Sequence, residues 1–135
     1  MSNFTVHPQL AQDSRSVCVL GVCEARLILD SRFPWLILVP QISNAAELHH
    51  LPLKTQQKVW QEVAKSAQSM ENIFQPDKIN IGMLGNMVPQ LHIHVVARFK
   101  SDSAWPGPVW GCGRAERSAV LLDRWTQLLR VSLSA

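Results

Sequence analysis

The chain has 135 residues, of which 47% are hydrophobic and 17% charged, and its formal net charge is +3. This length suits one domain, expected over residues 1–135, and the hydrophobic fraction excludes a disordered chain. No lysine or arginine cluster indicates a nucleic-acid partner, and no apolar run approaches the roughly 18 residues of a membrane span. The start does not resemble a signal peptide, and three cysteines do not suit a disulfide framework, so we expect a cytoplasmic protein.

The first predicted elements are three strands. Apolar residues favour short strands at 17–20 and 25–29, joined around Gly21. A turn at 30–34, rich in Asp, Ser and Pro, leads to a wholly apolar strand at 35–40. That strand has the pattern of a buried one, and the proline at its end stops it.

Two helices are predicted next. Ser43 followed by Glu47 is a helix-start signal, and it predicts one short helix before the proline at position 52. The clearest helix covers 53–75, because apolar residues recur there every three or four positions and share one face. These residues are Val59, Val63, Ala67, Met70 and Phe74.

The second half of the chain predicts a hairpin and a final helix. Strands at 78–83 and 90–99 are separated by a short loop that contains Gly and Asn, which favours antiparallel pairing. An irregular Pro/Gly-rich stretch at 101–113 precedes a helix at about 118–130. Its expected apolar side consists of Val120, Leu121, Trp125, Leu128 and Leu129. The order predicts an α+β fold, with an antiparallel sheet and helices on one face.

The strand at 90–99 carries three polar residues on an otherwise apolar segment. Alternate residues of a strand share a face, so Gln90, His92 and His94 are expected to point the same way. The apolar residues between them would face the helices. Side chains two apart lie about 7 Å from each other, so the three would form a short polar track.

Three explanations of this track remain open. Histidines can stand on an exposed sheet face without a function. Alternatively, two histidines could bind one metal, with a third ligand from His49, His50 or a cysteine. Finally, a neutral imidazole attacks phosphorus well, and the phosphoramidate that it forms is labile. This nucleophilic explanation uses every polar group on the track.

The segment QLHIHVV resembles the signature of the histidine triad (HIT) family, in which three histidines alternate with apolar residues. Gln90 takes the place of the first histidine. The segments LILD, WLILVP, the long helix and INIGMLGN precede it in the family's order, so the resemblance covers about 17–110. It implies a single HIT-like domain: a five-stranded antiparallel sheet with a long helix and a C-terminal helix, forming a half-barrel that dimerises.

The resemblance assigns catalytic roles to the track. His92, at the middle position, would attack the α-phosphorus of a nucleotide and form a nucleotidyl-histidine, which water or another acceptor then discharges. Attack requires an unprotonated nitrogen, so the other ring nitrogen should donate to a fixed acceptor such as a backbone carbonyl. His94 would hydrogen-bond the phosphate or the leaving group. Gln90 can orient its neighbours, but it cannot titrate near pH 7.

The resemblance also indicates substrate-binding residues. Asp30 would accept from the ribose hydroxyls, and Asn80 would contact the phosphate; otherwise they are a turn-forming Asp and a strand-end Asn. Asn86 lies in the loop beside the expected phosphate, where Gly85 would let the backbone approach the anion.

Two tryptophans keep alternative roles. Trp35 stands where many relatives carry a histidine, and it would either line the pocket or stack on a base. Trp110 would reach toward a partner's active site, as the C-terminal stretch of some relatives does; otherwise it is a packing residue.

The resemblance implies a nucleotidyl hydrolase or transferase acting on nucleoside monophosphate derivatives, such as phosphoramidates and dinucleoside polyphosphates. The alternative is a nucleotide-binding sensor or adaptor with little catalysis. We expect a small-molecule nucleotide and a second copy of the chain as partners, and no cofactor, metal, nucleic acid or membrane.

Overall fold

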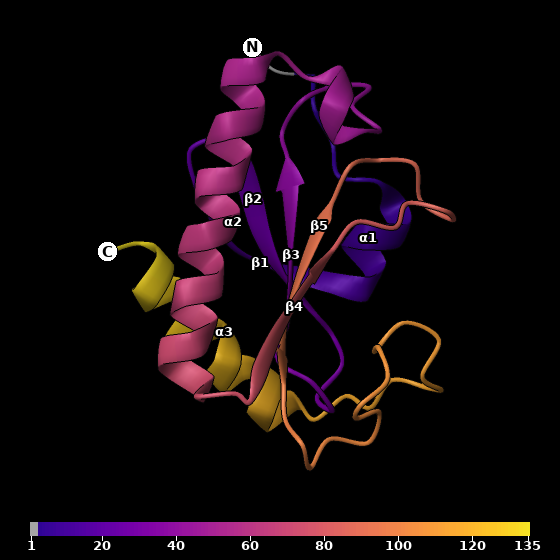
Figure 1. Ribbon diagram of the computed structural model, residues 1–135, viewed down its shortest axis with the longest axis vertical. Coiled ribbons are helices and arrows are strands. Elements are labelled where there is room, and N and C mark those ends of the chain that lie inside the picture. Colours follow the sequence, from indigo (N-terminus) through magenta and orange to yellow (C-terminus); the bar gives the residue numbers. More distant parts are fainter. Residues whose placement is uncertain (1–2) are drawn as a thin grey trace.

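A five-stranded antiparallel sheet forms the centre of the fold in the computed structural model, which describes residues 3–135 (Figure 1). The strands are β1 (Ser14–Val19), β2 (Cys23–Ile28), β3 (Trp35–Pro40), β4 (Lys78–Gly82) and β5 (Ile93–Arg98). Their order is β1-β2-β3-β5-β4, and all neighbours pair antiparallel. The expected sheet and its β4–β5 hairpin are confirmed. The single domain expected over 1–135 includes residues 1–2, which lie outside the described part.

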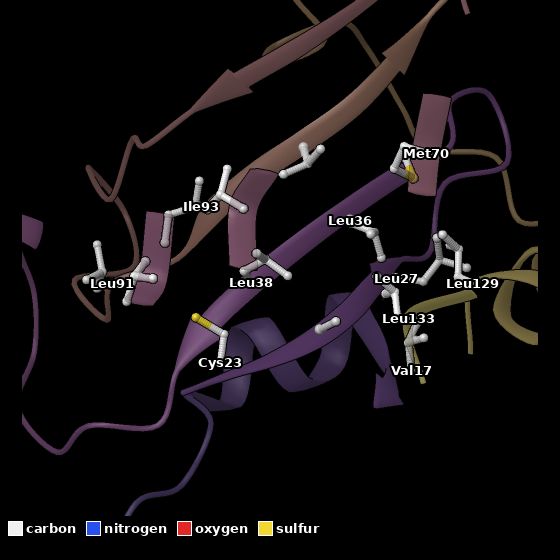
Figure 2. Close-up of a cluster of buried hydrophobic side chains, with 14 of the residues drawn as sticks. Val17, Cys23, Leu27, Leu36, Leu38, Met70, Leu91, Ile93, Leu129 and Leu133 are labelled. Carbon is white, nitrogen blue, oxygen red and sulfur yellow. The ribbon is translucent and has the colours of Figure 1, made fainter. Parts of the chain in front are cut away.

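Two helices, α2 (Leu53–Phe74) and α3 (Ala119–Leu133), pack against one face of this sheet. The long helix runs beside the strands in Figure 1. Its apolar spacing buries Val59, Val63 and Met70, as expected. Figure 2 shows the resulting core, in which side chains of β1, β2, β3 and β5 meet those of the helices. The labelled residues include Leu27, Leu36, Leu38, Met70, Ile93 and Leu129.

The opposite face of the sheet is covered by α1 (Pro8–Asp13), a helix that the sequence did not predict. His7 caps it, because Nδ1 accepts from the backbone N–H of Gln9 at 3.1 Å, and Pro8 occupies the first turn. Leu10 is its buried residue, and it belongs to a second cluster with Phe33, Trp35, Ile37, Val39, Val96 and Val109. The long helix and the last helix lie on one face as expected, and α1 adds a helix to the other face. Six residues are too few to give a periodic apolar signal.

The prediction of a short helix between Ser43 and Pro52 was wrong. Only Leu48–His50 form a helical turn, of the 3-10 type, called η1. Asn44 has a φ of 61°, which lies in the left-handed region. Asparagine tolerates this conformation better than most residues do, but the conformation interrupts an α-helix. The helix-start signal at Ser43 therefore precedes a turn.

The last helix is present, and two residues of its expected apolar side, Leu129 and Trp125, do pack against the core, but the other three are exposed. Val120 is 79% exposed, and Leu121 and Leu128 are each 41% exposed. The buried residues are Leu122, Thr126, Leu129 and Leu133. Thr126 is polar, so an apolar pattern does not include it. It can be buried because its hydroxyl donates to the carbonyl of Leu122 at 2.6 Å. No helix within residues 3–135 is long and apolar enough to cross a membrane.

Candidate active site

A cavity of about 940 Å³ lies on the sheet face that carries the second hydrophobic cluster. Its walls come from α1 and the residue before it, from 28–35, from the loop at 84–88, and from the irregular stretch at 109–117. The two histidines of the polar track, His92 and His94, are among the lining residues. Met87, which is 94% exposed, lies at its rim. The cavity thus brings together segments far apart in the sequence.

His92 immediately precedes β5, and its ring is held by one backbone contact. Nδ1 lies 2.7 Å from the carbonyl oxygen of Gln90. A carbonyl oxygen only accepts, so Nδ1 carries the proton and Nε2 of the neutral ring has a free lone pair. The side chain is 7% exposed, and the residue lines the cavity. This is the backbone contact that a nucleophilic imidazole is expected to make.

His94 is fixed by a different partner, Trp35. Trp35 pairs with Val96 and His94 pairs with Ile37, so the two side chains are diagonal neighbours on one sheet face. The indole Nε1 of Trp35 donates to Nδ1 of His94 at 2.9 Å. Burial, and to a smaller extent the charge of the neighbouring His92, together lower the pKa of His94 from 6.5 to about 3. His94 is therefore neutral near pH 7.

Gln90, the third residue of the track, does not line the cavity. Its Oε1 accepts from the backbone N–H of His7 at 2.8 Å, and its Nε2 donates to the carbonyl of Thr5 at 2.9 Å. It precedes β5, whose ladder begins only at Ile93. The side chain thus fastens the N-terminal segment beside the cavity, and only the backbone oxygen of Gln90 contacts the track histidine His92.

Asp30 lines the cavity, and it is 2% exposed. Its carboxylate accepts from Nη2 of Arg32 at 2.8 Å, from Nε at 3.0 Å and from the Arg32 backbone N–H at 3.1 Å. The backbone N–H of Glu116 also points to Oδ1, at 3.4 Å. Arg32 additionally donates to the carbonyl of Cys112. This pair therefore ties the turn after β2 to the C-terminal wall of the cavity.

Asn80 takes part in a separate buried network. Its Oδ1 accepts from Nη1 of Arg98 at 2.9 Å, and Arg98 forms a salt bridge with Asp102. Burial alone would raise the pKa of Asp102, but hydrogen bonds from Arg98 and from two backbone N–H groups lower it to about 2. Asn80 is not among the residues that line the cavity.

Gly85 and Asn86 are in the expected place, because the loop between β4 and β5 forms part of the cavity wall. Gly85 has a φ of 73°, a backbone conformation that residues with a side chain rarely adopt. The left-handed turn at this glycine brings the loop, with the exposed Asn86, alongside the two histidines.

Trp110 reaches into the same chain's cavity and contacts His94. The ring centroids lie 5.2 Å apart, and the planes are nearly perpendicular, at 80°. Gly82, which pairs with His94 across β4 and β5, makes room for this ring: a Cβ at Gly82 would lie 3.0 Å from it. A second edge contact joins Trp110 to Trp35 at 6.4 Å.

The residue pattern overlooked several lining residues. His7, Arg32 and Arg117 all line the cavity and give it a basic or titratable character. His7 lies at the cavity because it caps α1, and Arg32 lies there because it forms an ion pair with Asp30. Within residues 3–135, no three His, Cys, Asp or Glu side chains are grouped so that they could hold a metal ion.

Comparison with solved structures gives close matches over almost the whole chain. A histidine triad protein from Bradyrhizobium japonicum has a TM-score of 0.94 at 34% identity, covering 96% of this chain and 98% of that one. One from Sinorhizobium meliloti has a TM-score of 0.91 at 39% identity, covering 99% and 97%. One from Marinobacter aquaeolei has a TM-score of 0.93 at 36% identity, covering 97% and 96%.

A comparison with curated proteins gave no match. The family model described as the HIT domain matches residues 9–101, which include all five strands, the long helix and both histidines of the track, His92 and His94. The expected five-stranded fold is thus found in similar structures as well as in this one. The chain belongs to the HIT domain family.

Proposed function

We propose that this protein is a nucleotidyl hydrolase or transferase that acts at the α-phosphate of nucleoside monophosphate derivatives through a covalent intermediate on His92. The observation that carries the proposal is the contact between Nδ1 of His92 and the carbonyl of Gln90, 2.7 Å apart. It leaves the lone pair of Nε2 available at the wall of a cavity that is large enough for a small ligand. Membership of a family of nucleotide-binding hydrolases and transferases supports the same assignment.

In the first step, Nε2 of His92 attacks the α-phosphorus, and the bond from phosphorus to the leaving group breaks. The ring keeps its proton on Nδ1, so the nucleotidyl-histidine carries a positive charge, which the hydrogen bond to the carbonyl of Gln90 stabilises. His94 lies beside it, with ring centroids 4.9 Å apart, and it hydrogen-bonds the phosphate or the leaving group. For a phosphoramidate, the departing amine takes its proton from solvent.

In the second step, water or another acceptor attacks the same phosphorus, and the bond between phosphorus and Nε2 breaks. Because the ring leaves as a neutral imidazole that still holds its Nδ1 proton, no proton has to be removed from it first. With water as the acceptor, the water gives up one proton to solvent, and the products are the nucleoside monophosphate and the original His92.

The remaining substrate contacts are also proposals. The loop at Gly85 and Asn86 would lie along the phosphate, and Asp30 would accept from the ribose. We keep Asn80 and Gln90 as predicted site residues, although their side-chain amides are bound to Arg98 and to the N-terminal segment. Gln90 would then act through its backbone oxygen on His92.

The test is mass spectrometry of protein quenched during reaction with adenosine 5′-phosphoramidate. We expect an adenylyl adduct that maps to the peptide containing His92 and is absent from His92→Ala. Turnover without an adduct in rapid-quench samples would contradict the covalent mechanism. Nucleotide binding with neither adduct nor turnover would instead favour the sensor or adaptor.

We further propose that the protein forms the homodimer that its family resemblance implies, and that it works in the cytoplasm. The outer face of α2 supports the dimer, because Leu53 is 68% and Trp60 is 53% exposed on it. Sedimentation velocity should give the mass of two chains, and Trp60→Glu should shift the equilibrium toward one. The free cysteines at 18, 23 and 112 suit a reducing compartment.

A further inference from the structure

Two buried nitrogen atoms at the cavity have no hydrogen-bond partner. Among the side chains of residues 3–135, the buried polar atoms without a partner are Oγ of Ser66, Nε2 of His94 and Nε1 of Trp110. His94 and Trp110 line the cavity, whereas Ser66 does not. A buried polar group without a partner costs free energy, so it marks a place where a ligand can supply the missing bond.

Trp35 determines what kind of group Nε2 of His94 is. An indole N–H can only donate, so Nδ1 of His94 must accept and carries no proton. A neutral imidazole has one N–H, which is therefore on Nε2. Protonating the ring would place two N–H groups against each other, so this contact and burial both oppose the charged form. His94 thus presents a donor, as Trp110 does.

Trp110 has a donor of fixed type as well, because its Nε1 always carries a proton. Its ring is held in place by packing over Gly82 and by edge contacts with His94 and Trp35. The indole N–H is buried without being used to hold the ring. Two neutral donors on adjacent rings, neither of which has a partner within residues 3–135, suit an anion.

We propose that Trp35 is a positioning residue that holds His94 with its proton on Nε2, and that this N–H and the indole N–H of Trp110 donate to the oxygens of a substrate phosphate. The second part rests on the proposed function, since it specifies how the same cavity receives the phosphate. It adds Trp110 as a binding residue and Trp35 as a positioning residue, neither of which belongs to the triad pattern.

Binding of AMP and adenosine tests the role of Trp110. Trp110→Phe keeps an aromatic ring but removes the N–H together with part of the indole, so adenosine serves as the control for lost packing. We expect the variant to weaken AMP binding about tenfold in calorimetric titration, as for the loss of a hydrogen bond to a charged group. Adenosine, which lacks the phosphate, should bind to both proteins with the same affinity. An unchanged affinity for AMP, or equal weakening for both ligands, would overturn the assignment.

The ¹⁵N chemical shifts of the His94 ring test the role of Trp35 in the unliganded protein. We expect Nδ1 to show the shift of an unprotonated nitrogen and Nε2 that of a protonated one, between pH 5 and 8. Trp35→Phe should give averaged shifts of two tautomers and bind AMP more weakly, with adenosine binding unchanged. A proton on Nδ1 in the native protein overturns the proposal without any variant.

These two measurements are separate from the test of the proposed function. Tautomer and binding are measured without turnover, whereas the adduct on His92 depends on catalysis. A protein that shows the expected shifts and the AMP-specific loss, but forms no adduct, would retain the two-donor site and lose only the covalent mechanism.

Discussion

His92 and His94 lie with ring centroids 4.9 Å apart, and their hydrogen bonds require opposite tautomers. The Nδ1–H of His92 donates a hydrogen bond to a backbone carbonyl, so Nε2 of this ring has a lone pair. His94 accepts on Nδ1 from an indole, so its Nε2 has a proton. Two identical side chains two residues apart therefore differ in chemistry: Nε2 of one offers a lone pair, and Nε2 of the other offers a hydrogen-bond donor.

The first prediction concerns this division of roles. His92→Ala should lower turnover of adenosine 5′-phosphoramidate by at least about a thousandfold, because no other group replaces the nucleophile. AMP affinity should change by less than about threefold, since the proposed phosphate donors are His94 and Trp110. His94→Ala is the matched comparison, and it should weaken AMP binding while retaining the adduct on His92. Retained turnover in His92→Ala would contradict the mechanism.

A second prediction follows from the low pKa of His94, about 3 in the folded chain against an ordinary 6.5. Below pH 6.5 the unfolded chain binds a proton at this residue, and the folded chain does not until the pH nears 3. The free energy of unfolding should therefore decrease as the pH is lowered from about 6 to 4, by up to about 1.4 kcal/mol per pH unit.

Urea titrations of the native protein and of His94→Leu measure this contribution. Leucine does not titrate, so the variant should lose stability less steeply over the same interval, whatever its stability at pH 7. Asp102 does not interfere, because its contribution is lost only as the pH falls below about 3.8 toward 2. Parallel curves for the two proteins would show that His94 takes up its proton normally in the fold.

Asn80 and Asn86 give a third prediction, which separates support of the fold from substrate contact. Asn80→Ala removes an acceptor from the buried Arg98, and it should lower the free energy of unfolding by about 1.5–3 kcal/mol. Asn86 is exposed, so Asn86→Ala should change the free energy of unfolding by less than about 0.5 kcal/mol. AMP affinity, measured in parallel, should fall mainly in Asn86→Ala. The reverse pattern would assign the phosphate contact to Asn80.

A fourth prediction concerns the ribose. Arg32 and Glu116 already fill the acceptor positions of Oδ1 of Asp30, whereas Oδ2 bonds chiefly to Nη2 of Arg32. A carboxylate oxygen has about two lone pairs, so one acceptor position remains. We expect Asp30 to accept from a single ribose hydroxyl.

Titration with AMP, 2′-deoxy-AMP and 3′-deoxy-AMP tests this directly. One deoxy analogue should bind about tenfold more weakly than AMP, and the other should bind like AMP. Equal losses for both would mean that the arginine moves away when the nucleotide binds. No loss for either would remove Asp30 from the ribose site.

The sheet and its long helix could be predicted from the sequence because their signals are local. The wholly apolar strand at Trp35–Pro40 and the repeat along Leu53–Phe74 are visible in short windows. The position of Gly85 and Asn86 at the same cavity as the histidines could also be expected, because a hairpin brings its loop and strand together.

What the sequence could not predict depends on contacts between distant residues. The role of Trp35 follows from its diagonal position beside His94, which requires the β3–β5 register. Trp110 needs the space above Gly82, and a glycine in a strand does not reveal which ring will cover it. Arg98 satisfies Asn80 from the neighbouring strand, so an amide expected at the phosphate is bound elsewhere.

Gln90 shows how a change at one motif position can alter the pH response of a neighbouring structure. Its side-chain amide accepts a hydrogen bond from His7 and donates one to Thr5. An amide does not titrate, so both bonds persist at every physiological pH. A histidine there would change charge near pH 6.5 and lose its acceptor when protonated. The N-terminal border of the cavity is therefore anchored by an interaction that acidification does not loosen.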